Sequence, residues 1–151
     1  MSSWQEFATQ VPDFAQRVEG LFVAYKHHTM ATLRLDGSPR ISGSEVTFDD
    51  GRLLLGMMPG TRRAADLRRD PRLAIHSHTV DPLETNPASW DGDAKITGRA
   101  VELPAGLRPP EGSDWFAVEV AEVVLTKVGD PADHLVIESW KADRGHKTQR
   151  R

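Results

Sequence analysis

Hydrophobic positions in the first 26 residues recur with the spacing of a helix. Six of them follow one another at intervals close to three or four residues: Phe7, Val11, Phe14, Val18, Leu21 and Phe22. Such spacing puts apolar side chains on one face of an α-helix. Pro12 interrupts the series, but proline is well tolerated in the first turn of a helix. We therefore predict a short helical turn before Pro12 and a longer helix from Pro12 to about Ala24.

From Thr29 the spacing changes to two, which is typical of strands. One face would carry Ala31, Leu33 and Leu35, and the other Met30, Thr32 and Arg34. Turn-forming residues at 36–39 and 49–51 separate this strand from a second at 41–48 and a third at 52–58. We predict that these three strands form an antiparallel meander, which leads into a short helix at 62–69.

The rest of the chain predicts further strands joined by irregular segments. Strand patterns occur at 72–79, 94–103, 115–128 and 134–140, whereas prolines and glycines mark loops at 80–91 and 104–113. Residues 141–151 are polar and basic, which favours a mobile tail. We predict one domain at 1–140, mainly β with flanking helices, built as a six-stranded antiparallel barrel because closure removes exposed sheet edges.

Composition and charge exclude several classes of function. The chain has 151 residues, a formal charge of -3 and no cysteine. The absence of cysteine excludes disulfides, thiolate metal sites and cysteine nucleophiles. The acidic balance argues against a nucleic-acid partner. The N-terminus has no signal-peptide pattern, and no apolar run approaches the roughly 20 residues of a membrane span, so we expect a cytoplasmic protein without a membrane partner.

The predicted helix at 62–69 has an unusual charge distribution. Thr61 is a good N-cap, and Asp70-Pro71 is a natural stop. Arg62 and Arg63 therefore occupy the first turn, where the helix dipole is already positive. A bound anion such as phosphate would offset this repulsion, since free backbone N–H groups at a helix start bind anions. The alternative is that both arginines are simply solvated.

Other candidate groups carry weaker signals. His76 and His78 would share one face of a strand, and Glu84 could supply a third metal ligand, but any two residues at this spacing do so. Trp90 could line a substrate pocket, although large aromatic residues more often belong to a core or an interface. Met57 and Met58 are equally compatible with core packing.

Four segments in sequence order resemble one known family. Residues 29–42, 51–74, 96–100 and 134–140 are similar to the successive hairpin, strand-helix, later strand and closing strand of the pyridoxamine 5'-phosphate oxidase-like proteins, the flavin-binding split β-barrels. The resemblance covers roughly residues 15 to 140. It implies a homodimer with two flavin sites at the subunit interface.

The resemblance also implies which residues hold the cofactor. It places the flavin phosphate near Arg40 and Ser42 on a strand and near Thr61, Arg62 and Arg63 at the helix start. It places Met57 and Met58 where a strand passes the flavin ring. Arg63 stands where the family often has lysine, which keeps the charge and adds a fork suited to phosphate.

These expectations lead to two functional hypotheses. The first is an oxidoreductase that binds FMN, or the related deazaflavin coenzyme, and transfers hydride or electrons to or from a small-molecule substrate bounded by the 80–91 loop. The second is a non-catalytic flavin-binding carrier or sensor. Pyridoxamine phosphate oxidase activity itself is less favoured, because the 104–113 segment leaves little room for the helical insert of those oxidases. A metal-binding barrel at His76 and His78 is a third possibility.

Overall fold

The computed structural model describes residues 1–108 and 112–151. Its helices are α1 Trp4–Gln10, α2 Pro12–Val23 and α3 Arg62–Arg69, with 3-10 turns at Pro87–Ser89 and Ala105–Leu107. Its strands are β1 His28–Leu33, β2 Pro39–Ser44, β3 Thr47–Asp49, β4 Arg52–Met57, β5 Arg72–His76, β6 Asp93–Glu102, β7 Asp114–Val128, β8 Leu135–Lys141 and β9 Gly145–Arg150. The mainly antiparallel β fold with flanking helices is confirmed, but the described residues form nine strands rather than six.

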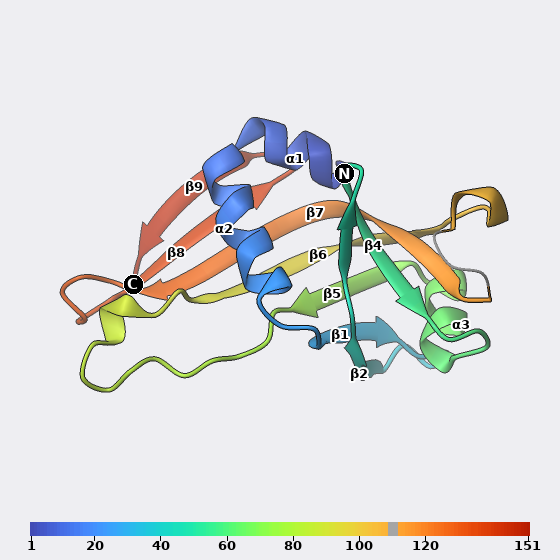
Figure 1. The fold of residues 1–151 in the computed structure, drawn as a ribbon, viewed down its shortest axis with the longest axis horizontal. Helices are drawn as coiled ribbons and strands as arrows, with labels where there is room; N and C mark the ends of the chain where they lie inside the picture. Colours follow the sequence, from blue (N-terminus) through green and yellow to red (C-terminus); the bar gives the residue numbers. More distant parts are fainter. Residues whose placement is uncertain (109–111) are drawn as a thin grey trace.

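The two N-terminal helices form as the sequence predicts. The Ser3 hydroxyl accepts a hydrogen bond from the Glu6 backbone N–H at 3.1 Å, and the Glu6 carboxylate accepts from the Ser3 N–H at 2.6 Å, which starts α1. Pro12 begins α2, where its missing N–H costs nothing. Both helices lie against one side of the sheet (Figure 1). Their apolar faces join the core through Trp4, Phe7, Phe14, Ala15, Val18 and Phe22.

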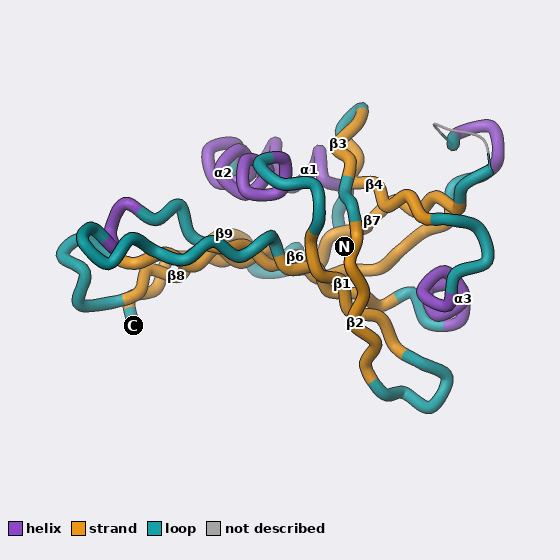
Figure 2. Tube along the Cα trace, turned by 60° about the horizontal axis from the view of Figure 1, so that its bottom comes forward, coloured by secondary structure: helices purple, strands orange, loops and turns teal. Residues whose placement is uncertain are grey.

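Strand β7 organises the sheet. The strand order is β2-β1-β5-β6-β7-β4-β3, with every pairing antiparallel. The first residues of β7 pair with β4, its later residues pair with β8, and most of its length pairs with β6. Strands β8 and β9 extend to one side, and the remaining strands curl around the other (Figures 1 and 2).

The predicted three-stranded meander is wrong. The segment expected as one strand at 41–48 is divided into β2 and β3, because Glu45 and Val46 lie outside both strands. Strand β2 pairs with β1, whereas β3 pairs with β4 on the other side of the barrel. The predicted division of β1 into two faces holds, and the face with His28, Met30 and Thr32 is the buried one. A regular two-residue alternation does not say which face is inside.

The C-terminal residues form a strand and not the expected mobile tail. Gly145, at φ +74°, follows a tight turn, and β9 then pairs with β8 along its whole length. The side chains of β9 are almost all exposed, so its polar composition reflects solvent on its surface and does not prevent backbone pairing. Leu135 and Arg151 also exchange backbone hydrogen bonds at 2.6 and 2.9 Å.

The expected irregular segments agree with the structure where it describes them. The loop at 80–91 contains a 3-10 turn, and so does the segment at 104–113, of which residues 109–111 lie outside the described residues. No helix in the described part of the chain is long and apolar enough to span a membrane.

Candidate functional site

The start of α3 carries a partly buried cation. The Thr61 hydroxyl caps the helix by accepting from the Ala64 N–H at 3.3 Å. Arg62 is exposed, but Arg63 is only partly exposed and donates to the backbone carbonyl of Gly43 at the end of β2. Burial lowers the pKa of Arg63, and no described carboxylate pairs with it. The protein therefore desolvates this charge without supplying an anion.

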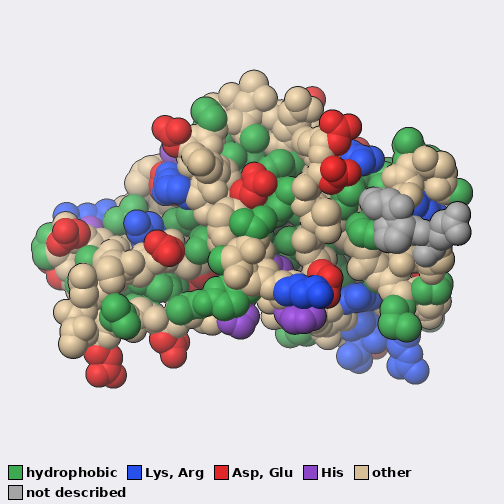
Figure 3. Space-filling model, viewed as in Figure 1, with side chains coloured by type: hydrophobic (Ala, Val, Ile, Leu, Met, Phe, Trp, Pro, Cys, Tyr) green, Lys and Arg blue, Asp and Glu red, His purple; other side chains and the backbone are tan. Residues whose placement is uncertain are grey.

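Arg63, from α3, lines a pocket of about 380 Å³ together with residues of four strands. The lining residues come from the end of β2 and the start of β3, from the end of β4, and from the start of β7. They are His27, Gly43, Ser44, Glu45, Thr47, Gly56, Met57, Met58, Arg63, Ser113 and Trp115. Lys and Arg side chains gather over this end of the molecule, near β2 and α3 (Figure 3). We call this space the Arg63 pocket.

Trp115 forms one wall of the Arg63 pocket and has an unsatisfied donor. Gly56 and Trp115 are paired in register across β4 and β7. A Cβ on Gly56 would lie 2.6 Å from the indole ring, so only glycine permits this approach. The indole Nε1 is buried and has no hydrogen-bond partner in the described protein. Buried donors are normally paired, so this unpaired N–H is an exception among the described side chains.

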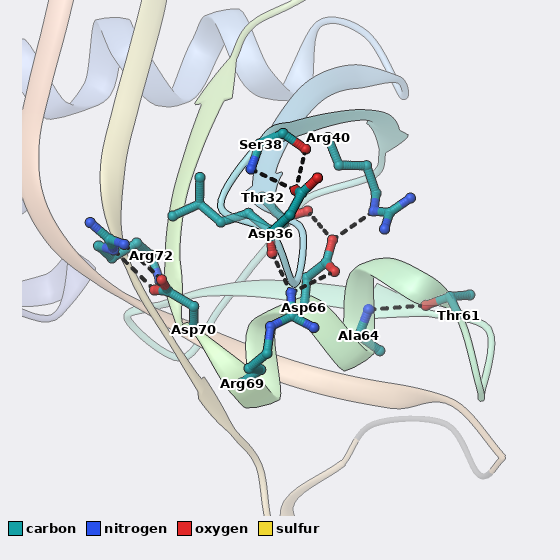
Figure 4. Close-up of polar contacts among 11 residues, drawn as sticks. Thr32, Asp36, Ser38, Arg40, Thr61, Ala64, Asp66, Arg69, Asp70 and Arg72 are labelled. Carbon is teal, nitrogen blue, oxygen red and sulfur yellow. Dashed lines mark hydrogen bonds and ion pairs between the residues drawn. The ribbon is translucent and has the colours of Figure 1, made fainter.

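A buried carboxylate connects α3 to β1 and β2. Asp66 is 2% exposed and accepts hydrogen bonds from Thr32 Oγ1 at 2.8 Å, Arg40 Nε at 2.6 Å and Arg69 Nη2 at 3.1 Å. Figure 4 shows these three side chains converging on Asp66. Burial acts to raise the pKa of Asp66, but the hydrogen bonds from Arg40, Thr32 and Arg69 outweigh it and lower the pKa to about 2. Asp66 is therefore ionised near neutral pH.

The structure brings some of the predicted cofactor residues together and separates others. Met57, Met58 and Arg63 line one pocket. Arg40 and Ser42 do not line it, and Arg40 has an internal carboxylate partner in Asp66. The remaining guanidinium nitrogens of Arg40 make no hydrogen bond within the described residues. The three-arginine phosphate cluster is thus reduced to Arg63 in the pocket, with Arg62 exposed beside it.

The weaker candidates have separate environments. Trp90 lines a different pocket, described below, and its Nε1 donates to the Val80 carbonyl at 2.6 Å. His76 lies near Asp93 at 3.8 Å, whereas His78 stacks on Tyr25. Across residues 1–108 and 112–151, no group of three His, Cys, Asp or Glu side chains is arranged to hold a metal ion.

Sequence reasoning missed Asp66. Asp66 is the one acidic residue in the basic helix Arg62–Arg69, and it lies on the buried face with Ala64 and Leu67, which is a signal that could have been used. Trp115 is the second residue of β7, at a partly exposed position of the alternation, and only the register across β4 shows that Gly56 leaves room for its ring.

Comparisons with known proteins identify the fold. No family model and no curated protein matches the chain. Among solved structures, PhzG from Burkholderia lata 383, in complex with tetrahydrophenazine-1-carboxylic acid, is 12% identical with a TM-score of 0.68, over 93% of this chain and 91% of that one. A pyridoxamine 5'-phosphate oxidase-related, FMN binding protein from Nostoc punctiforme PCC 73102 is 9% identical with a TM-score of 0.67, over 97% and 98%.

A third structure, described as an F420 reductase, is 15% identical with a TM-score of 0.52, over 70% of this chain and 94% of that one. These likenesses extend over most of the chain, although the identities are low. The chain therefore has the split β-barrel fold of the pyridoxamine 5'-phosphate oxidase-like proteins.

Proposed function

We propose that the Arg63 pocket binds a phosphorylated flavin, either FMN or the deazaflavin coenzyme. The observation that carries this proposal is the half-buried Arg63, which has a lowered pKa and no described carboxylate partner. A phosphate would supply the missing negative charge, and the first turn of α3 adds backbone N–H groups. Structural neighbours described as FMN binding and as an F420 reductase support a cofactor of this class.

The residues of the pocket suit such a cofactor. Arg63 would hold the phosphate, and the exposed Arg62 in the same first turn of α3 would add a second cation. Arg40, held by Asp66, lies outside the pocket lining. Met57 and Met58 offer apolar contacts for a flat ring, and the unpaired Trp115 N–H offers a donor to a ring oxygen or nitrogen. Thr61 would contribute indirectly, because its cap fixes the start of the helix that carries Arg63. Ser42 would contribute indirectly as well, because it belongs to the strand that carries Gly43, the backbone partner of Arg63. The bound flavin itself supplies hydride or electron transfer.

We further propose an oxidoreductase that acts on a small molecule and works as a homodimer. The support for a dimer is apolar surface close to the pocket. Ile41 on β2 is 74% exposed, and Met58, directly after β4, is 76% exposed. A second copy of the chain would cover these side chains and close the open side of the ring site.

The first prediction concerns Arg63. FMN and the deazaflavin coenzyme are titrated separately into the purified protein, and binding is followed by flavin fluorescence. We expect Arg63→Ala to weaken binding of the preferred cofactor by about 10- to 100-fold, because a charge-assisted hydrogen bond contributes roughly 1.5–3 kcal/mol. Arg144→Ala, which removes an exposed arginine in the turn between β8 and β9, is the matched control.

The outcomes separate the hypotheses. Failure of both cofactors to bind the wild-type protein would contradict the flavin assignment. Equal losses in Arg63→Ala and Arg144→Ala would place the phosphate elsewhere. Tight binding without reduction of the bound flavin by nicotinamide donors, and without oxidation of reduced flavin by candidate substrates, would favour a carrier or sensor over an oxidoreductase.

A further inference from the structure

A second pocket of about 450 Å³ lies away from the Arg63 pocket and shares no lining residue with it. Its walls come from the C-terminal half of α2, the segment at 78–92 and the end of β7. They are formed by Arg17, Gly20, Leu21, Ala24, Tyr25, His78, Val80, Trp90, Asp91, Gly92, Leu125 and Lys127. The lining is mainly apolar, and the volume is that of a small-molecule site. We call this space the α2 pocket.

Gly20 keeps the α2 pocket open at a cost to the helix. It lies inside α2, where glycine is less favourable than alanine because it loses more backbone freedom on folding. No heavy atom would approach a Cβ at this position within 4 Å, so close packing does not require a glycine there. The empty space in front of Gly20 is the pocket itself. A larger side chain would occupy the place of a ligand.

Three aromatic side chains of the wall, the stacked pair Tyr25 and His78 and the separate Trp90, are held in fixed positions. Tyr25 and His78 stack with ring centroids 4.1 Å apart and an interplanar angle of 22°. The backbone N–H of His78 donates to Nδ1 of the buried His28 at 2.9 Å, which holds this part of the segment against β1. Trp90 is fixed by its hydrogen bond to the Val80 carbonyl. Flat, preorganised aromatic walls favour a flat aromatic ligand.

The charges around the α2 pocket favour an acid group on that ligand. Arg17 already pairs with Glu138 through two hydrogen bonds. Lys127 lines the pocket and forms no ion pair with any described residue. Asp91 is exposed on the same lining and would repel an anion, so Lys127 is the group of the lining that can attract the acid group.

We propose that the α2 pocket is a second ligand site, which binds a planar aromatic carboxylate with its ring against the Tyr25, His78 and Trp90 walls and its acid group at Lys127. This inference does not rest on flavin binding, since the Arg63 pocket is separate. The site can therefore exist in a protein that binds no flavin.

The test uses 2-naphthoate as the probe, measured by isothermal titration calorimetry without added cofactor. We expect Gly20→Leu to weaken binding at least about tenfold, because its side chain fills the pocket. Gly20→Ala is the matched control and should bind within about twofold of wild type, since it adds a single methyl group to a helix that tolerates it. Both variants should keep or raise the melting temperature, which excludes misfolding as the cause.

Charge recognition is tested with Lys127→Met and with 2-naphthylmethanol, the neutral analogue. We expect Lys127→Met to weaken 2-naphthoate about tenfold and to leave the alcohol unchanged. Arg63→Ala should bind 2-naphthoate as the wild type does. The proposal is overturned if wild type does not bind 2-naphthoate, if Gly20→Leu binds it normally, or if Lys127→Met and wild type bind it equally.

Discussion

At the scale of single residues, Asp66 organises the basic end of the molecule. Its carboxylate accepts from Thr32 on β1, Arg40 on β2 and Arg69 on its own helix, so one buried anion joins three elements. It also keeps Arg40 and Arg69 from being unpaired cations close to Arg63. The sequence alone predicts an excess of arginine here, but it does not show that the single acidic residue of α3 faces inward.

We predict that Asp66→Asn lowers the free energy of unfolding at neutral pH by roughly 2–4 kcal/mol, because buried donors lose their anion. The pKa of Asp66 falls from its ordinary value of 3.8 to about 2 on folding. The ionised carboxylate therefore stabilises the fold above about pH 4, and this contribution is lost as the pH falls from about 4 to 2.

Urea unfolding between pH 2 and about pH 7 checks this prediction through the difference between the two proteins. The difference in unfolding free energy should be largest at neutral pH and shrink below about pH 4. A gap of constant size across this range would mean that the charge of Asp66 contributes nothing.

Trp115 gives a second prediction at this scale. Phenylalanine keeps an aromatic ring over Gly56 but removes the unpaired Nε1–H. We expect Trp115→Phe to change the free energy of unfolding by less than about 1 kcal/mol and to weaken flavin binding about 5- to 10-fold, since the lost hydrogen bond is made to the ligand. Chemical denaturation and flavin titration on the same preparation measure both. A variant that loses stability and keeps its affinity would contradict this role.

At the scale of elements, local sequence signals predict helices well and polar strands badly. The cap at Thr61 and the stop at Asp70-Pro71 correctly bound α3 at Arg62–Arg69. The apolar spacing before Ala24 likewise predicts α2. Strand β9 escapes prediction because an exposed edge strand needs no apolar residue and is recognised only by its backbone pairing with β8. The meander fails for a different reason: β2 and β3 do not pair with each other, and the distant partners β5 of β1 and β7 of β4 leave no local signal.

We predict that deleting Asp143 to Arg151 lowers the free energy of unfolding by about 1–3 kcal/mol, as thermal and urea unfolding would show. The deletion removes the backbone pairing with β8 and the contact of His146 with the Phe14 ring, whose centroids are 4.9 Å apart. Lys147→Ala, a change at an exposed side chain of β9, should stay within about 0.5 kcal/mol of wild type. An unchanged stability of the shortened chain would mean that β9 behaves as a free tail.

At the scale of the whole molecule, the sequence predicts the architecture better than the site. Four segments in the right order indicate the split barrel, and the fold confirms it. Of the expected cofactor residues, Met57, Met58 and Arg63 meet in one pocket, whereas Arg40 bonds to Asp66. The difference arises because a strand position fixes where a side chain begins, while its partners depend on elements that pack from elsewhere in the chain.

The proposed dimer gives the prediction that belongs to this scale. We expect the wild type to sediment as a dimer and Ile41→Lys to sediment as a monomer, because a buried lysine at an apolar contact is unfavourable. Flavin affinity should fall in monomeric Ile41→Lys, because the partner would no longer complete the ring site. Leu135→Lys, at an exposed apolar residue of β8, is the control and should remain dimeric. A monomeric wild type would contradict the proposal.

The pairing of β7 with strands on both sides also affects how the molecule unfolds. It is shared by the β4 side, which carries the Arg63 pocket, and by the β8 side, next to which the α2 pocket lies. Unfolding of β7 along its whole length breaks the pairing on both sides at once. The two ends therefore form one cooperative unit, in which a ligand held at either pocket slows the opening of the entire sheet.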